Sequence, residues 1–346
     1  MRSRGSASIT VLMFLLALSL LASGVAFVAV TSSDYFRQSK RRSESKGDLV
    51  RKAEEVVELL VDRSIDPVDS PLNLLFTEIE VLGGEQFTIS LKDVGSYLGL
   101  NWIRKPVLKA TGLLLDRESS AEELQQFRED TGLHMNIGGA YGRFFQEGAA
   151  IANNFTAYSY FNINLADEFV LRKLYALRTG DDPGAEAFHS KIHAYRLETE
   201  DKKLLEPDDL PAFLDTVYER LFPLINALPV INVNFAPESV LLTVLKVCDV
   251  ADPGDKVISV VASRQSRALN REAVQFIMGD DYEETQVRQY LGSRTWFWRL
   301  EIRSGRSILS WVLARIPSGV DREQPGLLQM DAYRDSFRLI EESYSL

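Results

Sequence analysis

An uninterrupted apolar segment is the strongest constraint on how this chain can fold. Residues 6–30 contain no charged side chain, and they directly follow Arg2, Arg4 and Gly5. At 1.5 Å per residue, a helix of this length spans roughly 38 Å, which crosses a bilayer core of about 30 Å with some tilt. The two arginines on the short side favour a cytoplasmic N-terminus. We therefore expect the main body of the protein to be exported.

Three interpretations of this segment stay open. A secretory signal peptide would be cleaved within Ala22–Ala26, although the apolar run continues to Val30. An ordinary anchor would keep the whole helix in the membrane. The third interpretation starts from the short basic leader, which ends in Gly5 and is joined directly to the helix. It resembles the class III leader of type IV pilins and pseudopilins, in which a prepilin peptidase would cut between Gly5 and Ser6 and methylate the new N-terminus. Most pilins have glutamate at the fifth mature position, where this chain has Thr10.

Composition limits the function classes. The chain has 346 residues, 45% of them apolar and 25% charged, which is ample for a core and suggests two or three domains. Its formal net charge of −10 argues against nucleic acid or anionic lipid as the main partner. Cys248 is the single cysteine of the sequence, so an internal disulfide is excluded.

The hydrophobic pattern predicts an α+β fold. Apolar residues at helical spacing continue to Val61, and the residue before Pro67 is pushed out of the helical region, so the first helix is expected to end near residue 62. Residues 75–81 and 86–91 alternate around Gly83-Gly84 and predict a hairpin. A second strand pair is expected at 294–302 and 308–314, and the middle, from about 94 to 290, is mostly helical in pattern. Helices between two strand pairs indicate an α domain inserted into an α+β domain.

The middle of the chain contains an internal repeat with an offset of 70 residues. Each copy predicts a strand-like Asn-x-Asn-x-Ala segment, a helix, an Asp-Pro-Gly hairpin and a second helix. The alignment holds without a gap for about 25 residues. The aligned pairs are Asn162 and Asn232, Asn164 and Asn234, Ala166 and Ala236, Glu168 and Glu238, Asp182 and Asp252, Gly184 and Gly254, Phe188 and Ile258, and Ile192 and Ala262.

The repeated polar residues are predicted to be structural rather than catalytic. Asparagine and aspartate side chains cap exposed N–H groups at helix starts, and the repeated glutamate is expected in the first turn, where the helix dipole favours it. The aspartate before each proline is expected to cap the second helix. The hairpins carry Asp181, Asp182, Asp252 and Asp255, which would repel a phosphate backbone, so DNA binding is disfavoured.

The leader, the missing glutamate at position 10 and the paired Asn-x-Asn-x-Ala units together resemble the protein K family of minor pseudopilins of the type II secretion system. Asp93-Val94-Gly95 and Leu100-Asn101-Trp102 resemble the segment leading into that family's insert. The resemblance implies a transmembrane stem helix, a pilin-like antiparallel sheet and a large inserted α-helical domain with two helix-hairpin-helix (SAM-like) units. The implied division begins with a leader at 1–5 and a stem helix, whose transmembrane half is 6–30 and whose periplasmic half is 31–64. An α+β domain follows at 65–95 and 285–317, and a tail at 318–346. The insert is 96–284, with repeat units at about 160–198 and 230–268.

The function implied by this resemblance is mechanical. Protein K caps the tip of a short periplasmic pseudopilus together with minor pseudopilins I and J, so the expected location is the inner membrane, with one span and the main body in the periplasm. The expected partners are those two proteins, other pseudopilus subunits, the prepilin peptidase and the bilayer. A tip subunit has no subunit above it, so an uncharged Thr10 agrees with that role. The alternative is a membrane-anchored periplasmic binding or scaffold protein unrelated to secretion.

No enzyme is predicted. Asp130-Thr131-Gly132 matches the aspartic protease triplet but lies in a polar stretch, and the sequence has no nucleophile elbow, phosphate loop or Cys-x-x-Cys pair. His189 and His193 have helical i, i+4 spacing, but neither recurs in the second copy, which favours a surface pair. Some relatives bind calcium in the α domain, and this chain offers oxygen donors without an assigned site: Asp181, Asp182, Asp208, Asp209, Asp252 and Asp255.

Overall fold

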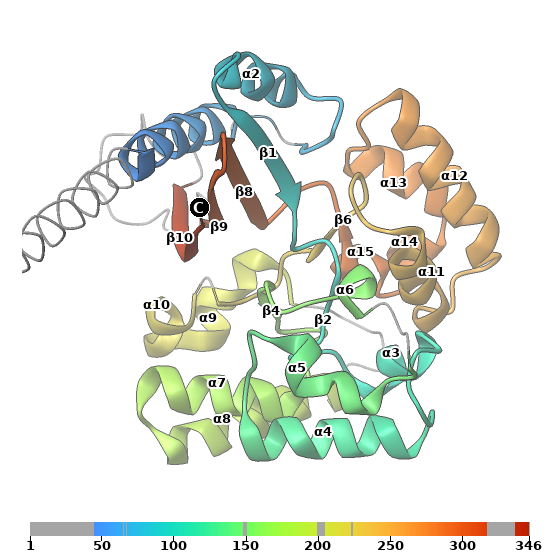
Figure 1. The fold of residues 1–346 in the computed structure, drawn as a ribbon. Coiled ribbons are helices and arrows are strands. Elements are labelled where there is room, and N and C mark those ends of the chain that lie inside the picture. Colours follow the sequence, from blue (N-terminus) through green and yellow to red (C-terminus); the bar gives the residue numbers. More distant parts are fainter. Residues whose placement is uncertain are drawn as a thin grey trace, which may run out of the picture.

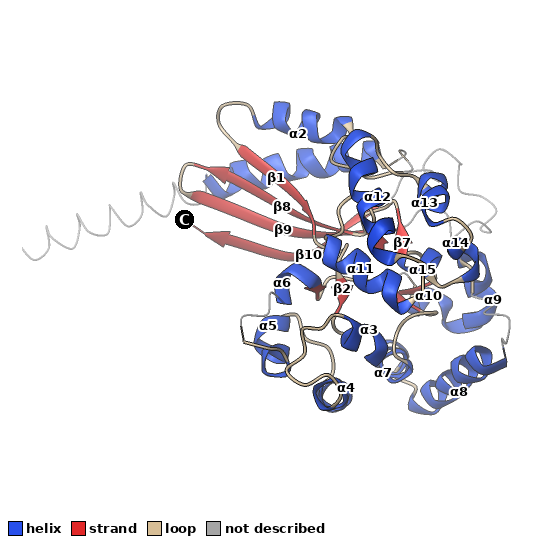
Figure 2. Ribbon diagram, turned by 90° about the vertical axis from the view of Figure 1, so that its right-hand side faces the viewer, coloured by secondary structure: helices blue, strands red, loops and turns tan. Residues whose placement is uncertain are grey.

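The protein is a mixed α+β structure built around a four-stranded antiparallel sheet. The computed structural model describes residues 45–64, 66, 68–147, 151–198, 205–222, 224–316 and 336–345. The sheet has the order β1-β8-β9-β10, made of β1 (Thr88–Asp93), β8 (Phe297–Ser304), β9 (Ser307–Ile316) and β10 (Ser336–Ser345). Figure 2 shows this sheet on one side of the molecule and most of the helices on the other. The predicted fold class is thus confirmed at the level of an α+β protein.

One face of the sheet is covered by two helices (Figure 1). The first, at residues 45–63, ends close to the predicted position, and α2 (Leu74–Gly83) follows it. Their apolar residues recur every three or four positions and pack on the alternating inward residues of the strands, which forms a core separate from that of the helical region. This core contains Leu49, Ala53, Val56, Leu60, Leu75, Ile79, Leu91, Trp298, Leu300, Ile302, Leu309, Trp311 and Leu313.

The predicted hairpin at 75–91 is wrong in its first half. Residues 74–83 form α2, and β1 begins only at Thr88. The buried residues Leu75, Ile79 and Gly83 are four positions apart, which is the helical period, whereas Val81 is 77% exposed. This short apolar run fits both the strand period and the helical period, and the helix forms because it packs against the first helix.

The second strand pair is confirmed. β8 and β9 pair antiparallel through a tight turn at Gly305-Arg306, where Gly305 has φ +59°. β1 pairs with β8, and β10 adds to β9 as an edge strand with an irregular register between Leu339 and Glu341. The expected tail at 318–346 therefore ends in a strand that the sequence pattern did not predict. None of the helices in the described ranges has the length and apolar character needed to span a bilayer, and the predicted span at 6–30 lies outside those ranges.

The region between β1 and β8 consists of three consecutive units of one design. Each unit opens with a two-residue strand, continues through two helices and several short helices, and closes with a two-residue strand parallel to the first. Four residues link each unit to the next strand (157–160, 227–230 and 293–296). Unit 1 comprises β2 (Leu98–Gly99), α3 (Lys105–Ala110), α4 (Ser119–Thr131), α5 (Ile137–Tyr141), the 3-10 helix η1 (Gly142–Phe144), α6 (Ile151–Asn154) and β3 (Phe155–Thr156).

Units 2 and 3 contain the two predicted repeat copies. Unit 2 comprises β4 (Phe161–Asn162), α7 (Glu168–Thr179), α8 (Asp182–Glu198), η2 (Pro207–Asp209), α9 (Leu210–Leu214), η3 (Asp215–Val217), α10 (Tyr218–Leu221) and β5 (Ile225–Asn226). Unit 3 comprises β6 (Ile231–Asn232), α11 (Glu238–Val247), α12 (Pro253–Ser266), α13 (Arg271–Met278), α14 (Asp281–Glu284), α15 (Val287–Tyr290) and β7 (Leu291–Gly292). The three units share one continuous hydrophobic core.

Candidate functional site

The repeated asparagines form the internal frame of each unit. In unit 3, Asn234 holds Leu269 by two hydrogen bonds: its amide donates to the Leu269 carbonyl (3.0 Å), and the Leu269 N–H donates to its Oδ1 (2.8 Å). Asn164 holds Leu205 in the same way, at 2.9 and 3.0 Å. These asparagines are buried, and they tie the start of a unit to the segment after its second helix. They do not cap helices, so that part of the prediction is wrong.

Unit 1 has the same frame, which the sequence comparison missed. Asn101 exchanges two hydrogen bonds with the backbone of His134, at 3.0 and 3.1 Å. An arginine from the second helix then bonds to the carbonyl of the equivalent residue in each unit: Arg128 to Ile103 (2.7 Å), Arg196 to Ala166 (2.8 Å) and Arg264 to Ala236 (2.7 Å). These shared contacts make unit 1 a third copy.

The ends of the helices correct several assignments. Glu168 and Glu238 lie in the first turns of α7 and α11, as predicted. In unit 2 the second helix is capped by Asp181, whose Oδ1 accepts the N–H of Gly184 (2.9 Å), and not by Asp182. Asp252 has φ +49° and no side-chain cap bond.

The other repeat positions differ in their burial. Ala166 and Ala236 are fully buried, whereas Gly254 has open space beyond its Cα. Ile258 is 67% exposed, so it does not match the buried Phe188, and Val257 and Val260 fill the core instead.

We expect Asn234→Ala to lower the free energy of unfolding by about 2–4 kcal/mol, because it leaves the N–H and C=O of Leu269 buried and unpaired at roughly 1–3 kcal/mol each. Urea unfolding measures this loss. The neighbouring variant Asn270→Ala is the control: it removes one exposed cap bond to the N–H of Ala273 (2.9 Å) and should cost about 1 kcal/mol. Equal losses for the two variants would contradict the structural role of Asn234.

A buried polar network joins unit 3 to the sheet. Arg315 on β9 and Asp69 are 1% and 5% exposed and form a bidentate ion pair, with Nη1–Oδ2 2.5 Å and Nη2–Oδ1 3.0 Å. Thr295 donates its N–H to Asp69 Oδ2 (2.8 Å) and its hydroxyl to Asp93 Oδ2 (2.5 Å). Asn232 donates its amide to the Asp69 carbonyl (2.9 Å) and the Thr295 hydroxyl (3.0 Å). The first asparagine of unit 3 therefore fixes that unit to the sheet.

The equivalent asparagine of unit 2 connects that unit to unit 3. The Asn162 amide donates to the carbonyl of Leu228 (2.9 Å) and to Oε1 of Gln289 on α15 (3.1 Å). Asn164 donates to the same Gln289 oxygen at 2.9 Å. Gln289 is 3% exposed, so this link is shielded from water. Unit 2 is thus bonded to unit 3, and unit 3 to the sheet, by side chains at equivalent repeat positions.

Asp93 makes this network sensitive to pH. Burial raises the pKa of its carboxyl group to about 6, although hydrogen bonds from Ser96, Thr295 and the Gly95 N–H oppose the rise. A raised pKa in the folded state contributes stability that is fully present below about pH 4 and is lost as the pH rises through 6.

We therefore expect the difference in free energy of unfolding, wild type minus Asp93→Asn, to fall by on the order of 2–3 kcal/mol between pH 4 and pH 7.5. Urea unfolding at several pH values gives this difference, and effects of other groups cancel in it. A difference that does not change with pH would contradict the raised pKa.

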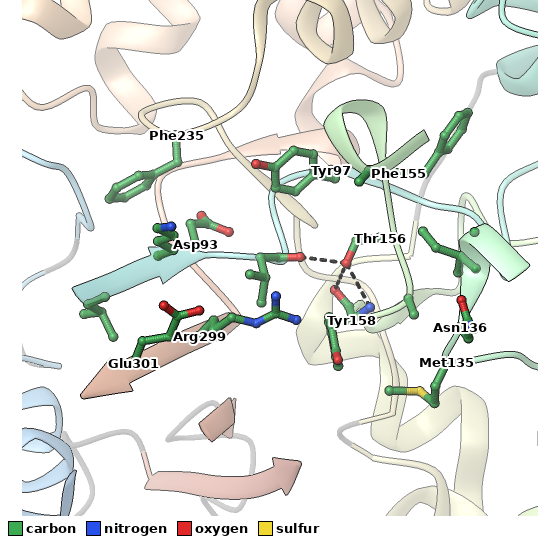
Figure 3. Close-up of a pocket in the computed structure, with 17 residues that line it drawn as sticks. Asp93, Tyr97, Met135, Asn136, Phe155, Thr156, Tyr158, Phe235, Arg299 and Glu301 are labelled. Atoms are coloured by element: carbon green, nitrogen blue, oxygen red, sulfur yellow. Dashed lines mark hydrogen bonds between the residues drawn. The ribbon is translucent and has the colours of Figure 1, made fainter. Parts of the chain in front are cut away.

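The main groove lies between the sheet and unit 1. It has a volume of about 600 Å³ and is open to solvent. Figure 3 shows Asp93 and Tyr97 above Arg299 and Glu301, with Tyr158 next to Arg299 and Met135 farther along the groove. Its Thr156 hydroxyl donates to the Val94 carbonyl (2.7 Å). The groove is lined by the cations Lys92 and Arg299, the carboxylate of Glu301 and several aromatic rings, which are groups that can bind a ligand.

A second groove lies between the first helix and α2. It has a volume of about 510 Å³ and is lined by acidic and apolar side chains. Glu55, Glu58, Asp62 and Glu78 contribute the carboxylates, and Glu78 is paired with Arg63. The exposed Val81 lies in the same groove.

Within the described ranges, no group of three or more His, Cys, Asp or Glu residues has an arrangement that could hold a metal ion. His189 and His193 do approach Glu168, at 3.8 and 3.1 Å. That carboxylate is also bound by Arg196 at 3.0 Å, and although burial opposes the effect, this arginine holds the pKa of Glu168 below its usual value. Asp181 and Asp209 are used as helix caps, which leaves the calcium prediction without an assigned site.

The predicted processing site, Gly5 and Ser6, and the tip-type Thr10 lie outside the described residues. In a comparison with known proteins, no protein-family model and no curated protein matches the chain.

Proposed function

We propose that this chain is a minor pseudopilin of the K type, which caps the tip of a type II secretion pseudopilus and supports protein export from the periplasm. The leader motif at Gly5-Ser6 carries the proposal, because a basic leader ending in glycine and joined directly to an apolar helix is the substrate of a prepilin peptidase. The proposal places the chain in the inner membrane with its body in the periplasm.

The fold supports this proposal in two respects. The helix at 45–63 packs on an antiparallel sheet, as a pilin stem helix would. The helical units leave the sheet after β1 and return at β8, so they form a bulky insertion between two neighbouring strands. Such an insertion would obstruct the addition of a further subunit, which suits a terminal position in a filament.

Its partners would be minor pseudopilins I and J and other pseudopilus subunits, with the bilayer around residues 6–30. A carboxylate unpaired in lipid is costly, so Thr10 suits a subunit with no neighbour above it. The role is assembly rather than catalysis. Neither groove contributes a reaction to this proposal.

The deciding experiment is mass spectrometry of the mature N-terminus, using full-length protein extracted from membranes. A chain that begins at Ser6 and carries an added methyl group is expected. A start near Ala26 or Phe27 would identify an ordinary signal peptide and reject the proposal, while an intact N-terminus would leave the anchored scaffold protein as the better interpretation.

Gly5→Ala provides the matched variant. It should block removal of the leader because the peptidase requires glycine at this position, while Gly24→Ala, within the apolar segment, should be processed normally. Normal processing of Gly5→Ala would contradict the proposal. Co-purification of the full-length chain with the I and J proteins of the same cell tests the tip role separately from processing.

A further inference from the structure

The free edge of β1 borders the main groove. β8 is its one sheet neighbour among the described strands. The Val94 N–H donates to the Phe297 carbonyl (3.0 Å), so residues 94 and 297 are a hydrogen-bonded pair. In an antiparallel ladder these pairs alternate, and the backbone groups of Leu91 and Asp93 therefore point away from β8. Both residues line the groove. The groove thus contains backbone donors and acceptors arranged to pair with another strand.

Two cations, Lys92 and Arg299, lie next to this edge. Lys92 and Arg299 are directly opposite each other on one face of the sheet, an arrangement that is destabilising for like charges. Among the described residues, no carboxylate forms an ion pair with either side chain, and the nearby Glu301 is paired with Arg303 at 3.2 Å. Arg299 instead lies over the ring of Tyr158, at 5.7 Å from its centroid. A carboxylate arriving on this face would relieve the repulsion.

The opposite face of β1 is apolar around Leu91. Leu91 is buried on that face, and Phe235, which also lines the groove, packs edge-on against Trp298 at 5.5 Å. Figure 3 shows Phe235 on the side of β1 opposite to Arg299 and Glu301. A strand added to this edge would present successive side chains to the two faces in turn. Its sequence should therefore alternate between residues for the cationic side and residues for the apolar side.

We propose that the edge of β1 binds an extended segment of a partner protein as a fifth strand, with a carboxylate of that segment facing Lys92 and Arg299. The mode is β-augmentation, in which main-chain bonds give affinity and side chains give specificity. A second copy of this chain is a poor occupant, because pairing β1 with β1 would add further cations to the same face. The inference does not depend on the pseudopilin proposal.

The probe is a fluorescent nine-residue peptide in which threonine and valine alternate and the central residue is glutamate, compared with the same peptide carrying central lysine. Fluorescence polarisation with the full-length protein in detergent should show binding of the glutamate peptide at least about fivefold tighter, as expected for a charge facing two cations. The preference should shrink as the salt concentration rises. Hydrogen exchange should slow at Leu91 and Asp93 when this peptide is bound.

Lys92→Glu should abolish the preference, and because Lys92 is exposed we expect the variant to fold. Lys246→Glu on α11, which is also exposed, is the matched control and should bind both peptides as the wild type does. The proposal is overturned if neither peptide binds at 1 mM, if both bind equally, or if exchange at β1 is unchanged. Dimerisation that is lost in Lys92→Glu would instead identify a second copy as the occupant.

Discussion

Replacing Arg315 with methionine is expected to lower the free energy of unfolding by about 3–5 kcal/mol. The guanidinium and the Asp69 carboxylate are almost fully buried and paired through two hydrogen bonds. Removal of the arginine leaves an uncompensated charge in a low-dielectric site, and Asp69 also holds the N–H of Thr295. Chemical denaturation followed by circular dichroism measures the loss.

Two further variants separate the charge effect from simple truncation. Combining Arg315→Met with Asp69→Asn removes both charges and keeps an acceptor for Thr295, so the pair should cost less than the sum of the single changes. Arg303→Ala breaks the exposed pair with Glu301 and should change stability by no more than about 0.5–1 kcal/mol. Strict additivity of the two buried changes would show that this ion pair is not the source of the effect.

Trp298→Ala is the second substitution with a large expected effect, again about 3–5 kcal/mol. Trp298 on β8 is fully buried and contacts Phe76 of α2 and Phe235 of unit 3, with ring centroids 6.2 and 5.5 Å away. Its loss would open a cavity where the sheet, α2 and unit 3 meet. We expect a lower midpoint of urea unfolding, because less apolar surface is buried in the folded state.

Trp298→Phe is the informative companion variant. The indole Nε1 has no hydrogen-bond partner in the described part of the chain, so phenylalanine would lose volume but no bond, and the expected cost is about 1–2 kcal/mol. Phe276→Ala on α13 removes an aromatic ring that is 84% exposed and should be nearly neutral. A Trp298→Phe variant as unstable as Trp298→Ala would show that packing volume is not the decisive property.

The sequence predicted the elements whose period was unambiguous. The end of the first helix and the β8–β9 pair followed from proline placement and strict alternation. The strand prediction at 75–81 was wrong because the four apolar positions of this short run fit both the strand period of two and the helical period of 3.6. Packing against the first helix favours the helix, and this contact cannot be read from the local sequence pattern. β10 was missed because the register irregularity between Leu339 and Glu341 breaks its alternation.

Unit 1 was not recognised as a copy from the sequence for a different reason. From the frame asparagine to the bracing arginine there are 27 residues in unit 1 (Asn101 to Arg128), 32 in unit 2 (Asn164 to Arg196) and 30 in unit 3 (Asn234 to Arg264). Because these spacings differ, a comparison without gaps cannot bring the arginines of the three copies into register. The signal that could have found unit 1 is the pairing of Asn with a later Arg, which is a contact in space rather than a motif in sequence.

The closure of each unit by its own parallel strand pair has a consequence for the order of folding. β1 and β8 are neighbours in the sheet, yet residues 94–296 separate them. Closing so long a loop in a disordered chain has an entropic free-energy cost on the order of 4 kcal/mol higher than closing a two-residue turn such as the one between β8 and β9. Folded units bring the two strand ends together beforehand. We therefore expect β1 to join the sheet last, so that refolding slows when any one unit is destabilised.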